Sequence, residues 1–206
     1  MSSSEHFARF GRENAGEAML LANPGMDRRA LRTRRALHEA MIGLILERNY
    51  DEVTVAEIAD AADVGRSTFY AHYTDKDALL RDGFGHLKAM LLKGVSEQAE
   101  GKAGDPLAFS PLMTIHMAEH VHLYRSLMVG SSGRIVREEI RRVVLDFVRA
   151  GLAHGGKPAP EPTVQLLVGS YLSLVEWWLD RGAREPAPDI DRAFRDFAQG
   201  GLGTTR

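Results

Sequence analysis

Apolar residues recur at the spacing of an α-helix along most of the chain. In residues 28–48 they fall at Leu37, Ala40, Met41, Leu44 and Ile45, which is an i, i+3, i+4, i+7, i+8 series. Similar series follow, and glycine or proline separates several of them, so these are expected to be separate helices. The predicted helices begin near residues 28, 54, 66, 76, 111, 122, 136, 163 and 190. The pattern therefore predicts an all-α chain of about nine helices.

Residues 54–76 form the most informative stretch, because they predict two short helices joined by a tight turn. Thr54 and Glu57 have the spacing of a capping box, which marks a helix start. In the second helix Phe69 and Tyr73 lie four residues apart and can anchor one side. The opposite side carries hydrogen-bonding or small groups suited to base edges and phosphates, namely Arg66, Ser67, Thr68, Tyr70, Ala71 and His72. This geometry is that of a recognition helix entering the major groove of DNA.

Positive charge gathers where two predicted helices begin. Arg28, Arg29, Arg32, Arg34 and Arg35 open the first helix, and Lys76 opens the fourth. Cations at these ends oppose the helix dipole, whereas a bound phosphate would make charge, dipole and amide donors act together. Arg32, Arg34 and Lys76 are therefore candidate phosphate contacts. The alternative is a solvated cationic face.

The run T-V-x-x-I-A-x-x-A-x-V-x-x-S-T-F-Y-x-H-Y-x-x-K-x-x-L-L, from Thr54 to Leu80, resembles the amino-terminal domain of TetR-family transcriptional regulators. The resemblance implies DNA contacts from the recognition face described above, and phosphate contacts from Thr54 and Lys76. Two positions depart from the family pattern. Gly65 stands where the family often has serine, and Asp63 takes a turn position often held by glycine, which is feasible because aspartate tolerates left-handed geometry.

These features divide the chain into three parts. Residues 1–27 are expected to be a flexible arm, residues 28–75 a three-helix helix-turn-helix DNA-binding domain, and residues 76–206 a helical ligand-binding and dimerisation domain. The helix that begins at Lys76 is the expected connection between the two domains. A single connecting helix can transmit a tilt to the recognition helix.

The segment 163–181 is apolar on almost every side, so it must be covered all round. One small bundle does not supply that cover, and part of the segment is expected to meet a second copy of the chain. The resemblance implies the same, since these regulators dimerise through their last two helices. The predicted dimer interface consists of Val168, Tyr171, Leu172, Val175, Trp177, Phe194 and Phe197.

A pocket for a small-molecule effector is also expected in the carboxy-terminal part, with adaptable apolar walls and a few polar groups. The candidate lining residues are Met113, His116, Met117, His120, Tyr124, Met128, Phe147, Tyr171 and Trp178. Each of them can equally be plain core.

The segment HMAEH, residues 116–120, matches the H-x-x-E-H pattern of a zinc hydrolase. No third ligand is evident nearby, and eight histidines make the spacing common by chance. No glycine-rich phosphate loop precedes a helix, and no G-x-S-x-G motif occurs. No enzymatic activity, no cofactor and no metal ligand are therefore expected.

Composition changes this picture little. The formal net charge of −2 does not by itself indicate nucleic-acid binding. The electrostatic argument for DNA binding therefore depends on the local groups of positive residues at the two helix starts. The chain has no cysteine and no long apolar run, and its polar start does not resemble a signal peptide, so a cytoplasmic protein without membrane contact is expected. The sequence favours a homodimeric repressor that binds a double-stranded DNA operator and leaves it when an effector binds. A helical metal- or small-molecule-sensing protein without DNA function, and a metal-dependent hydrolase, are the alternatives.

Overall fold

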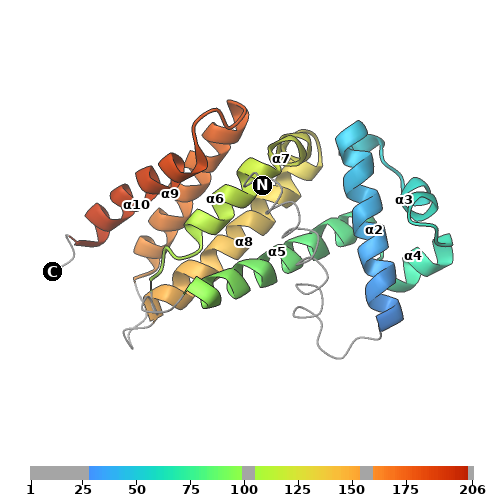
Figure 1. Cartoon of the computed structure of the whole chain (residues 1–206), viewed down its shortest axis with the longest axis horizontal. Coiled ribbons are helices and arrows are strands. Elements are labelled where there is room, and N and C mark those ends of the chain that lie inside the picture. The colour runs from blue at the N-terminus through green and yellow to red at the C-terminus, as the bar shows by residue number, and fades with distance from the viewer. Residues whose placement is uncertain (1–27, 99–104, 154–159, 204–206) are drawn as a thin grey trace, which may run out of the picture. The chain divides into compact units, whose positions relative to one another are not determined.

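The computed structural model describes residues 28–98, 105–153 and 160–203, and these are helical almost throughout (Figure 1). Within them lie nine α-helices and no strand, which confirms the predicted all-α class. The predicted arm, residues 1–27, lies outside the described residues. The elements are α2 (Arg28–Glu47), the 3-10 turn η1 (Tyr50–Glu52), α3 (Val55–Ala61), α4 (Arg66–His72), α5 (Lys76–Gln98), α6 (Ser110–Glu119), α7 (Val121–Met128), α8 (Ser132–Leu152), α9 (Glu161–Asp180) and α10 (Ala187–Gly203).

The described residues fall into two compact units that do not coincide with consecutive stretches of sequence. One unit takes the described residues up to Met90 together with Ser126–Glu139, and the other takes Leu91–Arg125 and the residues from Ile140 onward. Helix α5 contributes to both units, and so do α7 and α8. The domain boundary expected between residues 75 and 76 stays a prediction.

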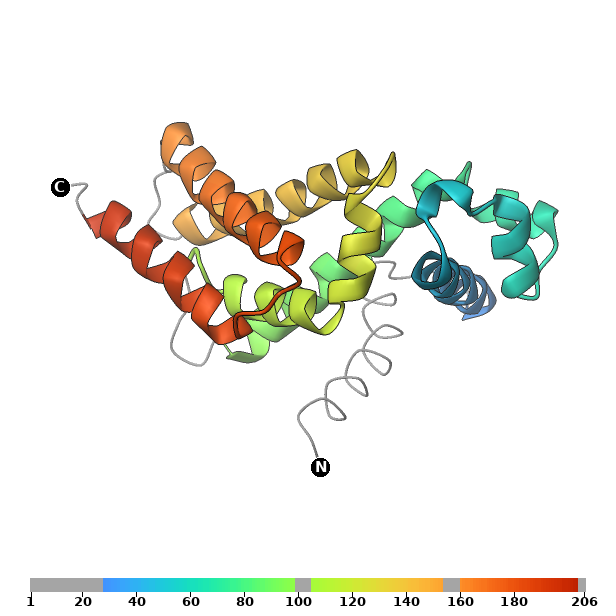
Figure 2. The same ribbon diagram turned by 90° about the horizontal axis from the view of Figure 1, so that it is seen from above.

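The first unit contains the helix-turn-helix segment. Helix α2 packs against α3, and α3 packs against α4, so that the three form one group in both views (Figures 1 and 2). The apolar series of α2 faces this group, with Leu37, Met41 and Ile45 almost fully buried. Ile58 of α3 and Phe69 of α4 are buried with no exposed surface. The apolar residues that the sequence pattern places on one face of each helix are therefore the ones buried between α2, α3 and α4.

Helix α5 runs from Lys76 as predicted, and it continues without a break through Gly83 and Gly85, where the sequence suggested an interruption. The turn η1 has no counterpart among the predicted helices. Helices α9 and α10 begin at Glu161 and Ala187, earlier than predicted, because Pro162 and Pro188 lie in their first turns. Proline is accepted there, since the first backbone N–H groups of a helix have no partner within it.

The second unit has its own core. Helix α10 packs against α6 and α9 (Figure 2). The rings of Phe109, Tyr171 and Phe194 meet edge to face in the interior. The Thr114 hydroxyl lies 3.1 Å from the Tyr171 hydroxyl, which gives both buried groups a partner. In α8 the predicted apolar face is buried from Val136 to Val148, while Arg137, Arg141, Arg142 and Arg149 are exposed.

This core corrects part of the predicted dimer interface. Val168, Tyr171, Val175 and Phe194 are each at most 2 % exposed within a single chain, so they offer no surface to a partner. The bundle covers more of α9 than the sequence suggested, because α6 and α10 both contribute to its core. Trp177 and Phe197 remain exposed, and Leu172 is half-buried.

Among the described helices, none has the combination of length and apolar character that crossing a bilayer requires.

Candidate nucleic-acid interface

Helix α4 presents two different faces. Phe69 is buried and Tyr73, which follows the helix, is 5 % exposed, so these rings hold α4 against the unit. Arg66, Ser67, Tyr70 and Ala71 are exposed on the other side, and Thr68 and His72 are half-buried. The predicted recognition face is thus a surface of hydrogen-bonding and small groups on a helix anchored by aromatic rings.

The turn before α4 has the geometry that the sequence allows for. Asp63 has φ 54°, which is left-handed backbone, and aspartate tolerates this region better than most residues. Gly65 is the N-cap of α4 and makes no side-chain capping bond. A glycine N-cap is weaker than serine by only a few tenths of a kcal/mol, so α4 depends mainly on Phe69 and Tyr73 for its position.

Thr54 is committed to the start of α3. The predicted capping box is present: the Glu57 amide donates to Thr54 Oγ1 at 3.3 Å, and the Thr54 amide donates to Glu57 Oε2 at 2.9 Å. The Thr54 hydroxyl also donates to Glu57 Oε2 at 2.7 Å, and this bond, together with the one from the Thr54 amide, holds the pKa of Glu57 below its usual range, with a further contribution from the Arg48 guanidinium. Thr54 is exposed, and its contact to a phosphate stays a prediction.

Lys76 has a structural role that the sequence did not reveal. Its ammonium donates hydrogen bonds to the carbonyl oxygens of Tyr50 at 2.7 Å and Val53 at 2.8 Å, and a longer one to Asp51 at 3.4 Å. It also lies 4.3 Å from the centre of the Tyr50 ring. The positive charge at the start of α5 therefore satisfies the carbonyls of η1, which explains its position without a phosphate. The proposed phosphate contact of Lys76 stays a prediction, and it now has a competing explanation.

Replacing Lys76 with methionine separates these two roles, since it removes the ammonium and keeps an unbranched side chain. The carbonyls of η1 lose their charged donor, so the free energy of unfolding is expected to fall by about 1–3 kcal/mol in chemical denaturation. If Lys76 instead serves a phosphate, stability stays unchanged and the dependence of DNA affinity on salt flattens by about one unit in the logarithmic slope.

The arginines of α2 differ in their surroundings. Arg32 is exposed, as a phosphate contact requires. Arg34 turns toward its own unit: its guanidinium lies 5.2 Å from the centre of the Tyr73 ring and 3.8 Å from Asp82 Oδ1. Arg32 is thus the better placed of the two for DNA, while the contact from Arg34 stays a prediction.

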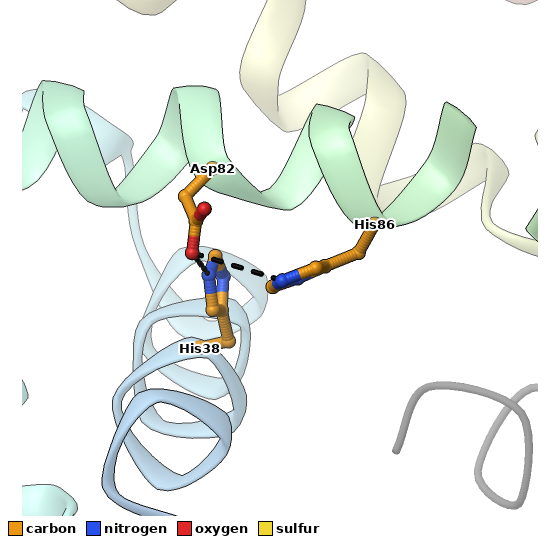
Figure 3. A group of neighbouring side chains, drawn as sticks. All are labelled: His38, Asp82 and His86. Carbon is orange, nitrogen blue, oxygen red and sulfur yellow. Dashed lines mark hydrogen bonds and ion pairs between the residues drawn. The ribbon is translucent and has the colours of Figure 1, made fainter. Parts of the chain in front are cut away.

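A polar cluster lies between α2 and α5 in the first unit. His38 of α2 and Asp82 and His86 of α5 point toward one another (Figure 3). Asp82 Oδ2 lies 3.1 Å from His38 Nε2, and it accepts a hydrogen bond from the Tyr73 hydroxyl at 2.6 Å. Burial opposes ionisation of Asp82, but the hydrogen bonds from His38 and Tyr73 hold its pKa below the usual range. Burial also lowers the pKa of His86 to about 4. Sequence reasoning missed this cluster, because only Asp82 and His86, four residues apart, show a pattern in the sequence.

The turn between α7 and α8 meets η1 within the same unit. The Ser131 amide donates to Asp51 Oδ2 at 3.1 Å, and the Ser131 hydroxyl donates to the same carboxylate. These two bonds lower the pKa of Asp51. The carboxylate thus links the start of the helix-turn-helix segment to a turn some eighty residues further along the chain.

The residues expected to line an effector pocket prove to be of two kinds. Met113, Met117, Tyr171 and Trp178 are fully buried, and the Trp178 indole donates to the Glu185 carbonyl at 3.0 Å, so they form core. Phe147 is almost fully buried as well, and Met128 belongs to the first unit.

His116, His120 and Tyr124 gather at the junction of α6 and α7. The two imidazole centres are 4.6 Å apart, and the Tyr124 ring lies 5.9 Å from His116. Burial lowers the pKa of His116 to about 3, with a contribution from His120, and burial also lowers the pKa of His120, so the surroundings favour the neutral form of each ring. They are the polar members of the predicted pocket that the structure brings together.

The HMAEH segment does not assemble a three-ligand metal site in the part of the chain that is described. Glu119 ends α6 and is exposed. The one group of three or more ligating side chains among the described residues is His38, Asp82 and His86. The hydrolase interpretation therefore has no supporting geometry at residues 116–120.

Comparison with known proteins matches the segment around α3 and α4. The sequence profile of the family described as "Bacterial regulatory proteins, tetR family" matches residues 38–82. A curated relative, the uncharacterized HTH-type transcriptional regulator YxbF of Bacillus subtilis (strain 168), is 39% identical over 57 residues, which is 27% of this chain. The matched region spans only 15% of the length of that relative.

Solved structures share the fold over most of the chain. A TetR transcriptional regulator from Streptococcus agalactiae 2603V is similar with a TM-score of 0.62 and 23% identity, covering 84% of this chain and 96% of its own. The TetR-family repressor FadR of Thermus thermophilus, solved in complex with lauroyl-CoA, is similar with a TM-score of 0.58 and 19% identity. The match covers 82% of this chain and 94% of the FadR chain. The family that matches residues 38–82 is described as one of regulatory proteins, which agrees with the expectation that this chain is not an enzyme. Residues 38–82 thus carry the amino-terminal domain of the TetR family of bacterial regulatory proteins, and the described helices share the fold of solved TetR-family regulators.

Proposed function

We propose that the protein binds a double-stranded DNA operator through α4, acts there as a repressor, and leaves the operator when a small molecule binds its second unit. The observation that carries this proposal is the exposed face of α4. Arg66, Ser67 and Tyr70 project from a helix whose opposite side is fixed by Phe69 and Tyr73. A rigid helix with donors along its free side is what reading base edges in a major groove requires.

A homodimer is part of the same proposal. Leu166 and Trp177 of α9 and Phe197 of α10 are 72%, 47% and 66% exposed in a single chain. Large apolar side chains on the last two helices are suited to an isologous contact, in which the same surface of each copy is used. A two-fold dimer also supplies two copies of α4 for a two-fold-symmetric operator.

The effector site is proposed around His116, His120 and Tyr124, where polar groups stand beside apolar core. A fold of this kind accommodates a ligand in FadR of Thermus thermophilus, which was solved with lauroyl-CoA. Neutral imidazoles at this site favour an uncharged or hydrogen-bonding group over a strongly acidic one.

Selection of bound fragments from a random-DNA pool tests this function directly. The purified full chain is expected to enrich an inverted repeat, with half-sites about one helical turn apart. Affinity for that sequence should fall steeply as salt is raised, because phosphate contacts release counterions. Failure to bind any duplex at low ionic strength would refute the proposal, and enrichment of an asymmetric site would refute its dimeric form.

A further inference from the structure

We propose that His38, Asp82 and His86 form a binding site for a divalent first-row transition metal ion, of which zinc is the best probe. Two imidazoles and a carboxylate are a common ligand set for such ions. One ligating atom from each residue lies within 4.8 Å of the others (Figure 3). The site lies within the first unit, between α2 and α5, and it includes no residue of the HMAEH segment.

The spacing of the three groups already approaches that of a metal centre. His38 Nε2 lies 3.1 Å and His86 Nε2 3.8 Å from Asp82 Oδ2. With zinc bonds of the usual length in tetrahedral geometry, neighbouring ligand atoms stand roughly 3.3–3.5 Å apart. The ligand atoms of the two histidines lie within 4.8 Å of each other, so this pair has to approach by up to roughly 1.5 Å, a movement that rotation of the side chains can supply.

His86 provides the observation that hydrogen bonding alone leaves unexplained. Its Nε2 atom is buried and makes no hydrogen bond, although it faces the other two side chains. Buried polar atoms without a partner are uncommon in native proteins and call for an explanation such as an ion. A metal ion placed among the three groups gives this nitrogen its partner.

Neighbouring groups supply the outer contacts of such a site. The Tyr73 hydroxyl donates to Asp82 Oδ2 at 2.6 Å, in the manner of the groups that orient metal-bound carboxylates. A metal ion can bind His38 Nε2 only if that nitrogen carries no proton. His38 therefore has to adopt the tautomer whose proton is on Nδ1, which leaves Nε2 free to bind the ion. The three protein ligands leave at least one coordination position for water.

Zinc binding by the metal-free full chain, measured by competition with a chromophoric chelator, tests the site. We expect one zinc ion per chain and an affinity that falls by at least about 100-fold in His86→Gln. His86 is chosen because its Nε2 makes no hydrogen bond that the substitution would break. The matched control is His120→Gln, which alters the other histidine pair and is expected to bind zinc as the parent does.

A second measurement needs no variant. In the parent protein, zinc is expected to shift the side-chain nitrogen resonances of His38 and His86 and to leave those of His116 and His120 in place. Absence of stoichiometric zinc uptake, equal affinity in His86→Gln, or shifts confined to other histidines would each overturn the proposal.

Occupation of the site also bears on DNA, a consequence that rests on the proposed function. Tyr73 is the C-cap of α4, so the ion is connected through one hydrogen bond to the end of the recognition helix. Zinc is expected to change operator affinity by about 5-fold or more, the lower range of allosteric coupling, and His86→Gln should abolish the change. Zinc uptake with unaltered operator affinity would overturn this coupling, whereas loss of all duplex binding would instead refute the DNA-binding function.

Discussion

Replacing Arg66 with alanine is expected to remove most of the preference for the operator over unrelated DNA. Arg66 is the first residue of α4 and is exposed, so its guanidinium can reach the edge of a guanine. One bidentate arginine–guanine pair is worth about 1–3 kcal/mol of discrimination. A dimer uses this contact in each half-site, so the two losses combine. Binding of operator and scrambled duplexes at one salt concentration measures the effect.

The matched control is Arg134→Ala, which removes the same charge from an exposed arginine at the start of α8. It should lower the affinity for both duplexes little and equally. Sedimentation and thermal unfolding should be unchanged in both variants, because neither side chain is part of a core. If Arg66→Ala retains the selectivity of the parent, base readout belongs to other residues of α4.

Replacing Phe197 with glutamate is expected to convert the proposed dimer into monomers. Phe197 is 66% exposed in a single chain, so the substitution should leave the fold intact. In a dimer through α9 and α10 it places an unpaired charge in the interface twice, once from each copy. Loss of a central aromatic contact is worth about 2 kcal/mol or more, so the dimer dissociation constant should rise at least roughly 30-fold. Analytical ultracentrifugation over a dilution series measures it.

Leu92→Glu is the control for this experiment. Leu92 is also a large, exposed apolar residue, 51% exposed, but it lies on α5 and not on the last two helices. It should sediment like the parent. Should Leu92→Glu dissociate while Phe197→Glu stays dimeric, the interface lies elsewhere, and the proposed use of α9 and α10 is wrong.

The helix-turn-helix segment was predictable because its determinants are local. The Thr54–Glu57 capping box, the left-handed turn at Asp63 and the four-residue spacing of Phe69 and Tyr73 all involve neighbours in sequence. Each of them restricts backbone geometry by itself, and together they specify which side of α4 is buried. The exposed face could therefore be listed before the structure was known.

The remaining features depend on contacts between distant residues. Lys76 meets the carbonyls of η1 some twenty-five positions earlier, and His38 meets Asp82 across 44 positions. Neither contact produces a periodic pattern of residue types from which it could be predicted. Tyr171 and Phe194 were expected at a subunit contact for a related reason: an apolar pattern shows that a residue is buried, but not whether its own chain or a second copy covers it.

The grouping of Ser126–Glu139 with the first unit has a practical consequence for shortened versions of this protein. A fragment ending near Met90 would keep all of α4 but would lose Ser131, the hydrogen-bond donor to Asp51, and Glu139, which pairs with Arg81. Such a fragment would carry new polar surface where the turn before α8 had been. Fusions that borrow the operator-reading part should therefore retain the chain through α8, or supply substitutes for these two side chains.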